Sequence, residues 1–225
     1  MPKGLIITID GPASAGKGTV ARIVAERLNL DYLDTGAMYR CAAFLLRNKG
    51  IDMNNDEAVK NALLSSTIEM GKTVEGHIEI KIDGENVTEK IRNPDISRLS
   101  SDIATKKVVR DHMTRLQKEF GRRGNIVAEG RDMGTYVFPE AQFKFYIDAS
   151  LEERGKRRSK QLNVTGSDDN ISTVMEDLKK RDEQDKNRLI APLHPAGNAV
   201  IIDTTRLNID QVVSIIINKV KGVYN

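Results

Sequence analysis

The sequence is poor in features that several common classes of protein require. Cys41 is the only cysteine, which excludes an internal disulfide and fits a reducing compartment. Aromatic residues make up 4% of the chain and tryptophan is absent, which disfavours a base-stacking surface for single-stranded nucleic acid. No apolar run approaches the roughly 20 residues of a membrane span, and no secretory signal is visible. We therefore expect a cytoplasmic protein with no membrane partner.

Neither basic nor acidic residues are in large excess over the other. The 35 basic and 32 acidic residues leave a net charge of +3, too little to indicate nucleic-acid binding. None of the three histidines has the spacing of a metal ligand or the setting of a catalytic base. The 225 residues suffice for one large domain with inserted lobes, and a monomer is expected.

A glycine-bracketed loop follows the first apolar segment of the chain. The run from Leu5 to Ile9 predicts a buried parallel strand, and apolar residues at helical spacing predict a helix from Thr19 to Leu28. A strand, a GxxxxGK loop and a helix in this order are typical of a P-loop, whose backbone N–H groups bind phosphate. The residues predicted to hold nucleotide phosphates are Gly11, Pro12, Ala13, Ser14, Ala15, Gly16, Lys17, Gly18 and Thr19.

Short apolar segments alternate with helical ones along the rest of the chain. This order predicts an α/β fold in which a five-stranded parallel sheet is flanked by helices. Strict alternation from His77 to Ile82, followed by Asp83-Gly84, predicts a small antiparallel sheet within residues 67–87. Because ligands bind beyond the carboxyl ends of parallel strands, we expect the charged residues that follow each strand at one edge.

Charged residues continue the apolar stripe of the helix predicted from Ile171 to Leu189. After Leu178 the same face presents Arg181, Asp185 and Arg188. A helix that emerges from the core into a cleft would give this pattern. The alternative is a solvated helix end with ordinary i,i+4 ion pairs.

Two further groups of arginines indicate phosphate recognition. Arg154, Arg157 and Arg158 precede a polar loop, which predicts a mobile lid that excludes water, although a solvated charged face is the alternative. Arg40 and Arg131 each follow a predicted strand and would donate to a second phosphate, because a guanidinium binds phosphate oxygens bidentately.

Five motifs in one order make the chain similar to the bacterial cytidylate kinases over nearly its whole length. They are ITIDGPASAGKGT, LDTGAMYR, AEGRDMGTYVFPEA, LEERGKRR and RDEQDKNRLIAPL. The resemblance implies a nucleoside monophosphate kinase, a transferase of pyrimidine nucleotide metabolism that moves the ATP γ-phosphate to CMP or dCMP with Mg²⁺. It implies one P-loop kinase domain over 1–225, with an inserted monophosphate-binding lobe at 36–96 and a helical lid at 151–170.

The same resemblance implies roles for individual residues. The basic residues implied in catalysis are Lys17, Arg131, Arg154, Arg158 and Arg188. The residues implied in acceptor binding are Thr35, Arg40, Ser101, Arg110, Arg131, Asp132, Arg181, Asp185 and Arg188. Among them Ser101 (or, in the other register, Ser100), Arg110 and Asp132 would recognise cytosine. We expect ATP as co-substrate and Mg²⁺ bound mainly through phosphates and water, since Gly18 offers no hydroxyl.

Three other interpretations stay open from the sequence. A kinase for another monophosphate, such as UMP or AMP, would share most of these features. A regulatory GTPase needs an Asn-Lys-x-Asp guanine-binding motif, and Asn48-Lys49-Gly50-Ile51 lacks its final aspartate. A nucleic-acid-binding module is opposed by the scarcity of aromatic residues and by the balanced charge.

Overall fold

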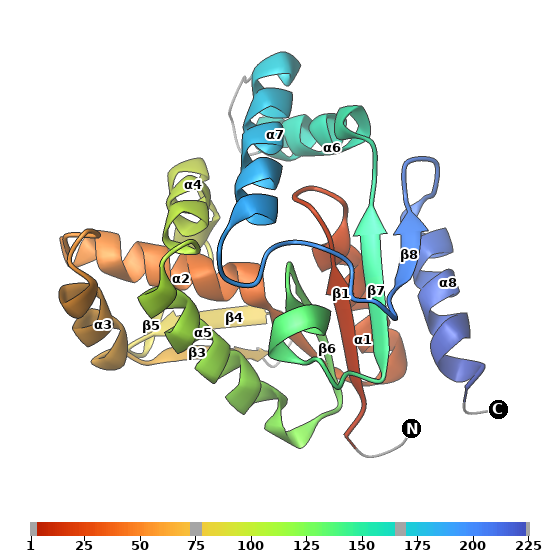
Figure 1. Ribbon diagram of the computed structural model, residues 1–225, viewed down its shortest axis with the longest axis horizontal. Helices are drawn as coiled ribbons and strands as arrows, with labels where there is room; N and C mark the ends of the chain where they lie inside the picture. The colour runs from red at the N-terminus through yellow and green to blue at the C-terminus, as the bar shows by residue number, and fades with distance from the viewer. Residues whose placement is uncertain (1–3, 73–77, 165–169, 224–225) are drawn as a thin grey trace. The chain divides into compact units, whose positions relative to one another are not determined.

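Five short strands form a parallel sheet in the computed structural model, which describes residues 4–72, 78–164 and 170–223 (Figure 1). Their order across the sheet is β2-β6-β1-β7-β8. The strands are β1 (Ile6–Asp10), β2 (Asp31–Asp34), β6 (Ile126–Gly130), β7 (Phe143–Asp148) and β8 (Val200–Asp203). All neighbouring strands run parallel, which confirms the predicted sheet. Their carboxyl ends therefore share one edge.

β1 is the central strand of the sheet, and both of its faces are covered. Ile7 and Ile9 are fully buried, and Ile7 lies beside Val127 of β6 and Phe143 of β7. A strand buried on both sides consists of a nearly continuous apolar run, and this run is what the sequence displays. The strand thus fixes the position of the loop that follows it.

Two helices build the main core with the sheet. Helix α1 (Lys17–Leu28) packs against α8 (Ile209–Lys221), and the apolar faces of both are buried with the strands. Asn208 and Gln211 form a capping box that begins α8. Val24 and Ile216 have no exposed surface, and burial of each such side chain stabilises the fold by roughly 1.5–3 kcal/mol.

Helices α6 (Leu151–Val164) and α7 (Ile171–Asn187) lie beyond the carboxyl ends of β1 and β7 (Figure 1). Leu162, Val174 and Leu178 form a small apolar cluster with Ala13 of the P-loop. This confirms the inward face of α7 at Val174 and Leu178. The prediction is wrong at Ile171, which is 42% exposed because it begins the helix outside that cluster.

The chain forms two units. The P-loop unit comprises Met1–Asp34 and Phe120–Asn225, and the inserted unit comprises Thr35–Glu119. Within the inserted unit, α4 packs against α2. The elements of this unit are α2 (Thr35–Asn48), α3 (Asp56–Leu64), β3 (Ile68–Lys72), β4 (Ile78–Ile82), β5 (Glu85–Asn86), the 3-10 turn η1 (Lys90–Arg92), α4 (Pro94–Ile103) and most of α5 (Lys107–Phe120).

The small antiparallel sheet lies in the inserted unit, as predicted. Its order is β3-β4-β5, and Asp83 (φ +50°) and Gly84 (φ +82°) make the turn between β4 and β5. His77, expected in the same hairpin, and residues 165–169 of the expected lid lie outside the described residues. The 3-10 turn η2 (Gly121–Arg123) and the π-helical turn η3 (Met133–Val137) have no counterpart among the predicted elements.

Gly11 makes the closest backbone approach of the P-loop to the sheet. Its φ is +147°, and a Cβ at this position would lie 1.9 Å from the carbonyl oxygen of Ile147. We expect Gly11→Ala to lower the free energy of unfolding by about 2–4 kcal/mol, since backbone must move to relieve the clash. Urea unfolding measures this. Gly197→Ala is the control: its Cβ would meet no atom within 4 Å, and equal losses in both variants would contradict the prediction.

Candidate active site

The loop between β1 and α1 has the backbone geometry of a phosphate cradle. Ser14 (φ +61°) and Gly16 (φ +92°) adopt left-handed conformations, and α1 begins directly afterwards at Lys17. Gly16 occupies the N-cap position and brings no capping side chain, and the first turn of α1 holds no acidic residue. The first N–H groups of the helix are therefore left to an anion, and the helix dipole favours negative charge there.

Lys17 lies folded over this cradle. Its Nζ donates a hydrogen bond to the carbonyl oxygen of Pro12 at 2.6 Å, and the side chain is buried. Burial and the nearby Arg131 lower the pKa of Lys17 to about 7, although Glu129 and Asp10 oppose the shift. A phosphate beside the ammonium group would favour its charged form. Lys17 is thus poised to gain charge when an anion binds.

A buried network of opposite charges joins the turn after β6 to the end of α7. Arg131 Nε lies 2.8 Å from Asp185 Oδ2, and Arg188 Nη2 lies 3.1 Å from Asp132 Oδ1. A longer contact of 3.6 Å joins Arg188 Nη1 to Asp185 Oδ1. The charged residues predicted on the inward stripe, Asp185 and Arg188, therefore face the two residues that directly follow β6. The alternative of a solvated helix end is wrong at Asp185 and Arg188.

The charges of this network reinforce one another. Burial opposes the ionised form of Asp185, but Arg131, Arg181 and Arg188 together lower its pKa. Burial likewise opposes the charge on Arg131, whereas its ion pair with Asp185 raises its pKa. The guanidinium groups are thus held charged in a desolvated setting. Each guanidinium has five N–H donors, so an arginine paired with a carboxylate can still donate to a phosphate.

Two carboxyl groups meet at the ends of β2 and β6. Asp34 lies beside Glu129 in the strand register, and their side chains share a hydrogen bond. Burial, followed by the charge of Asp34, raises the pKa of Glu129 to about 7. A Cβ at Gly18 would lie 3.4 Å from the Tyr32 hydroxyl and 3.7 Å from Glu129 Oε1. Both distances are ordinary van der Waals contacts, so position 18 lies directly beside these two groups.

Arg154, predicted as a lid residue, instead forms a buried brace. It donates to the carbonyl oxygens of Ala149 (3.0 Å) and Ala13 (3.3 Å) and to Asp182 Oδ2 (2.6 Å). These contacts tie α6 to the P-loop and to α7. Arg158, its predicted companion, donates to Gln161 within α6. The catalytic roles implied for these two arginines stay predictions.

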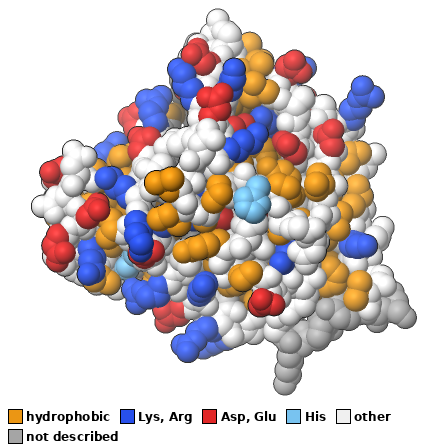
Figure 2. All heavy atoms as spheres, viewed as in Figure 1, with side chains coloured by type: hydrophobic (Ala, Val, Ile, Leu, Met, Phe, Trp, Pro, Cys, Tyr) orange, Lys and Arg blue, Asp and Glu red, His pale blue; other side chains and the backbone are white. Residues whose placement is uncertain are grey.

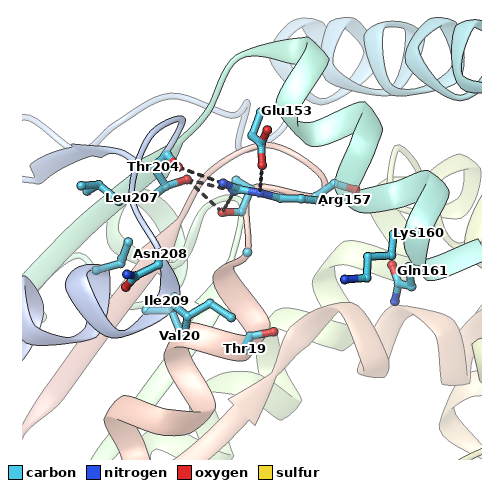
Figure 3. Close-up of a pocket in the computed structure, with 14 residues that line it drawn as sticks. Thr19, Val20, Glu153, Arg157, Lys160, Gln161, Thr204, Leu207, Asn208 and Ile209 are labelled. Atoms are coloured by element: carbon cyan, nitrogen blue, oxygen red, sulfur yellow. Dashed lines mark hydrogen bonds and ion pairs between the residues drawn. The ribbon is translucent and has the colours of Figure 1, made fainter.

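A cavity of about 710 Å³ opens beside the cradle (Figure 3). Arg157 reaches across it from α6 and donates to Thr204 O at 2.8 Å, Thr204 Oγ1 at 3.1 Å and Ala15 O at 3.3 Å. Glu153 accepts from Arg157 Nε at 3.0 Å. The apolar lining of the cavity includes Val20, Leu207, Ile209 and Val212. A planar group attached to phosphates in the cradle would meet both apolar contacts and a guanidinium here.

The remaining predicted acceptor residues belong to the inserted unit. Arg110 is fully buried on α5, its guanidinium lies 5.8 Å from the centre of the Tyr39 ring, and its Nη1 donates to Ala104 O at 3.3 Å. Ser100 is more buried than Ser101 and donates to Ser97 O at 2.8 Å. The unit's predicted acceptor residues are Thr35 and Arg40 on α2, Ser101 on α4 and Arg110 on α5.

Sequence reasoning missed three buried acids of the P-loop unit, namely Asp10, Glu129 and Asp182. Each was available in a quoted motif, but the spacing alone did not distinguish a buried carboxylate from an exposed one. Glu129 gave the clearest signal, since it directly follows the apolar run Ile126-Val127-Ala128. A charge that extends a buried strand must find a partner or hold a proton.

The candidate site combines cationic side chains with carboxyl groups that are paired with them. Among residues 4–72, 78–164 and 170–223, no group of three or more His, Cys, Asp and Glu side chains is placed to hold a metal ion. Thr19 is one of the hydroxyl residues that line the cavity next to the cradle. The arrangement therefore fits the binding of phosphates, together with any hydrated cation that those phosphates bring.

Comparison with known proteins gives consistent similarities across the chain. A family profile described as cytidylate kinase matches residues 7–222. The chain is 44% identical to a cytidylate kinase of Stutzerimonas stutzeri (strain A1501), over 96% of this chain and 94% of that protein. It is 43% identical to the cytidylate kinase of Bacillus licheniformis over 94% of each chain. These alignments include both units.

One solved structure shares the fold at low sequence identity. It is an uncharacterized protein from Eubacterium ventriosum ATCC 27560, with a TM-score of 0.52, 13% identity, and coverage of 98% of this chain and 99% of that chain. Within the described part of the chain, no helix is both long enough and apolar enough to cross a bilayer.

The pKa of Glu129 predicts a pH dependence of stability. Because its pKa is raised from 4.5 to about 7 by folding, the folded chain retains a proton that the unfolded chain releases between these values. The free energy of unfolding must therefore fall as the pH rises through this window. Glu129→Gln mimics the protonated group, and we expect its stability relative to the unsubstituted chain to increase by about 1–3 kcal/mol across the window.

Urea unfolding below and above that pH window measures the effect. Glu57→Gln, at an exposed carboxyl group of α3, is the control with the same change of charge. A relative stability of Glu129→Gln that is the same at both ends of the window would show that Glu129 ionises normally.

Proposed function

Because this chain belongs to the cytidylate kinase family, we propose that it transfers the γ-phosphate of ATP to CMP or dCMP, giving ADP and CDP or dCDP. The transfer is direct and in line, without a covalent enzyme intermediate. The observation that carries the proposal is the joint position of the phosphate cradle and the buried arginine network. Both lie at the carboxyl edge of the same sheet, and Arg131 is close enough to Lys17 to lower its pKa.

The donor occupies the cradle and the cavity. The backbone N–H groups of the loop and Lys17 bind the β- and γ-phosphates, and the adenosine part enters the cavity bordered by Arg157 and Thr204. Mg²⁺ would be held mainly by phosphate oxygens and water, with Thr19 nearby. When bound, the cation supplies charge neutralisation on the donor phosphates.

The acceptor phosphate binds the arginine network. A guanidinium carries five N–H donors, and the ion pairs with Asp185 and Asp132 already hold Arg131 and Arg188 in place. Arg40 and Arg181 complete the acceptor set implied by the family. Binding thus requires little rearrangement of the guanidinium groups in the P-loop unit.

Cytosine is distinguished from uracil by its amino group. Asp132 and Ser101 accept hydrogen bonds from that group, and Arg110 donates to the ring acceptors. Uracil places a carbonyl oxygen opposite the carboxylate, which leaves buried polar groups unpaired at a cost of roughly 1–3 kcal/mol. Thr35 supports the acceptor, and Asp185 recognises the 2′-hydroxyl of CMP, a contact that dCMP lacks.

Phosphoryl transfer needs no strong general base here. The attacking oxygen belongs to a phosphate that is already an anion, so the protein's task is to position it and to neutralise charge. Lys17, Arg131 and Arg188 supply positive charge at the transferred group, and Arg154 and Arg158 join them if the lid at 151–170 rearranges.

The remaining parts of the proposal concern partners and location. The enzyme acts as a monomer in the cytoplasm and binds nucleotides but no nucleic acid, and residues 36–96 form the monophosphate-binding lobe. On the face shown in Figure 2, Lys and Arg side chains lie among Asp and Glu side chains. This mixture supports the proposal that the enzyme does not bind nucleic acid. Cys41 is buried and, as the one cysteine of the sequence, forms no internal disulfide, which suits a reducing compartment.

A panel of monophosphates tests the activity. With ATP and Mg²⁺ present, coupled detection of ADP should give the highest kcat/KM for CMP or dCMP, with UMP and AMP at least about tenfold lower. A preference for AMP or UMP would replace the acceptor while leaving the kinase class intact. Absence of ADP formation with every monophosphate would refute the proposal.

Asp132 should determine the choice of base. We expect Asp132→Ala to reduce the ratio of kcat/KM for CMP to that for UMP by about 10-fold or more, because the acceptor of the amino group is lost. Asp182→Asn is the control, since Asp182 pairs with Arg154 outside the arginine network that binds the acceptor. An unchanged ratio in Asp132→Ala would contradict the assignment even if both rates fall.

A further inference from the structure

Asp10 connects the donor side of the site to the turn that bears two acceptor residues. It is the last residue of β1 and directly precedes the P-loop. Its Oδ1 accepts a hydrogen bond from the N–H of Met133 at 2.9 Å, and its Oδ2 accepts one from the N–H of Gly134 at 2.8 Å. The side chain is 4% exposed, so both bonds are shielded from water. One carboxylate therefore fixes two consecutive backbone groups.

The turn held by Asp10 carries Arg131 and Asp132. Both residues immediately precede η3, and they form the ion pairs with Asp185 and Arg188 of the P-loop unit. Asp132 has an irregular backbone conformation (φ −145°, ψ 22°) at the entry to η3. The carbonyl oxygen of Asp132 accepts hydrogen bonds from the N–H groups of Tyr136 (2.9 Å) and Val137 (3.1 Å), so Asp132 is tied to the turn that Asp10 anchors at Met133 and Gly134.

Close packing makes this anchor specific. A Cβ at Gly134 would lie 2.8 Å from Thr8 Oγ1, so the backbone of η3 already approaches β1 as closely as glycine permits. The N–H groups at the start of a helical turn lack partners within the turn, and a buried pair without acceptors is costly. Ionised Asp10 satisfies both with charge-assisted bonds.

The charges around Asp10 are consistent with this function. Burial raises the pKa of Asp10 to about 6 and Asp132 adds to the shift, whereas the two backbone N–H groups and Lys17 oppose it. The backbone bonds and Lys17 thus favour the charged form that holds the turn.

We propose that Asp10 is a positioning residue that sets the geometry of Arg131 and Asp132 for the acceptor nucleotide. The inference rests on the proposed function, because it assumes that these two residues bind a nucleoside monophosphate. Asp10 itself touches no substrate. Loss of its second acceptor oxygen loosens the turn and weakens acceptor binding selectively, while the backbone cradle for ATP persists.

Asp10→Asn provides the test because it keeps the shape of the side chain. The amide retains one acceptor oxygen but presents an NH₂ group to the other backbone N–H, so one of the two bonds must fail. Titration calorimetry with CMP alone and with ATP alone should show the Kd for CMP raised about tenfold or more and the Kd for ATP raised less than about threefold. Amide hydrogen exchange in the peptide that covers residues 131–137 should become faster in the unliganded variant.

Asp83→Asn is the matched control. Asp83 also accepts a backbone N–H, that of Thr67 at 2.7 Å, and its φ of +50° suits asparagine equally well. The control should leave exchange at 131–137 and both dissociation constants unchanged. If Asp10→Asn does not fold, Asp10→Ser, which retains one acceptor oxygen and removes the ion, takes its place in the same measurements.

The outcomes separate the inference from the proposed function. Equal weakening of CMP and ATP binding, or an unchanged Kd for CMP, would overturn the positioning role, as would unchanged exchange at 131–137. If the unsubstituted protein binds a different monophosphate, the proposed substrate fails, and the same comparison with that monophosphate then decides the role of Asp10.

Discussion

Opposite charges buried at the carboxyl edge of the parallel sheet are the constraint on which this structure depends. Arg188 and Asp132 have side chains only 5% and 4% exposed, and Asp185 bridges toward Arg131. Removing such groups from water costs several kcal/mol per ion, which the ion pairs offset only in part. A fold selected for stability alone would place apolar side chains here. The arrangement makes sense as a set of fixed donors for phosphates, whose own charge completes the balance.

The P-loop and the arginine network provide positive charge in different ways. The P-loop relies on backbone N–H groups and needs only one mobile cation, Lys17, whose charge increases when an anion arrives. The arginine network consists of guanidinium groups that remain charged and that carboxylates hold in place. Preorganised donors of this kind lower the barrier because they need not reorient during the reaction. Arg154 braces α6 against the P-loop and α7.

The sequence predicted the fold well because its signals are local. Apolar runs predicted all strands of the parallel sheet, and Asp83-Gly84 predicted the hairpin turn through a backbone preference. The stripe on α7 also placed Asp185 on the inward face, since helical spacing fixes which residues share a face, whereas Arg188 lies just beyond the end of the helix in an extended conformation. The brace formed by Arg154 and the anchor formed by Asp10 could not be predicted, because each depends on partners far away in the chain. Burial, which decides whether a charge is solvated or paired, is a property of the folded chain.

The central claim is that the cradle and the buried arginines receive two different phosphates at one edge of the sheet. The most direct measurement is a crystal structure with CMP and a non-hydrolysable ATP analogue bound together. We expect Lys17 to lie at the β- and γ-phosphates, and Arg131 and Arg188 to donate hydrogen bonds to the CMP phosphate. Lys17 remote from the triphosphate, or both arginines turned away from the acceptor, would contradict it.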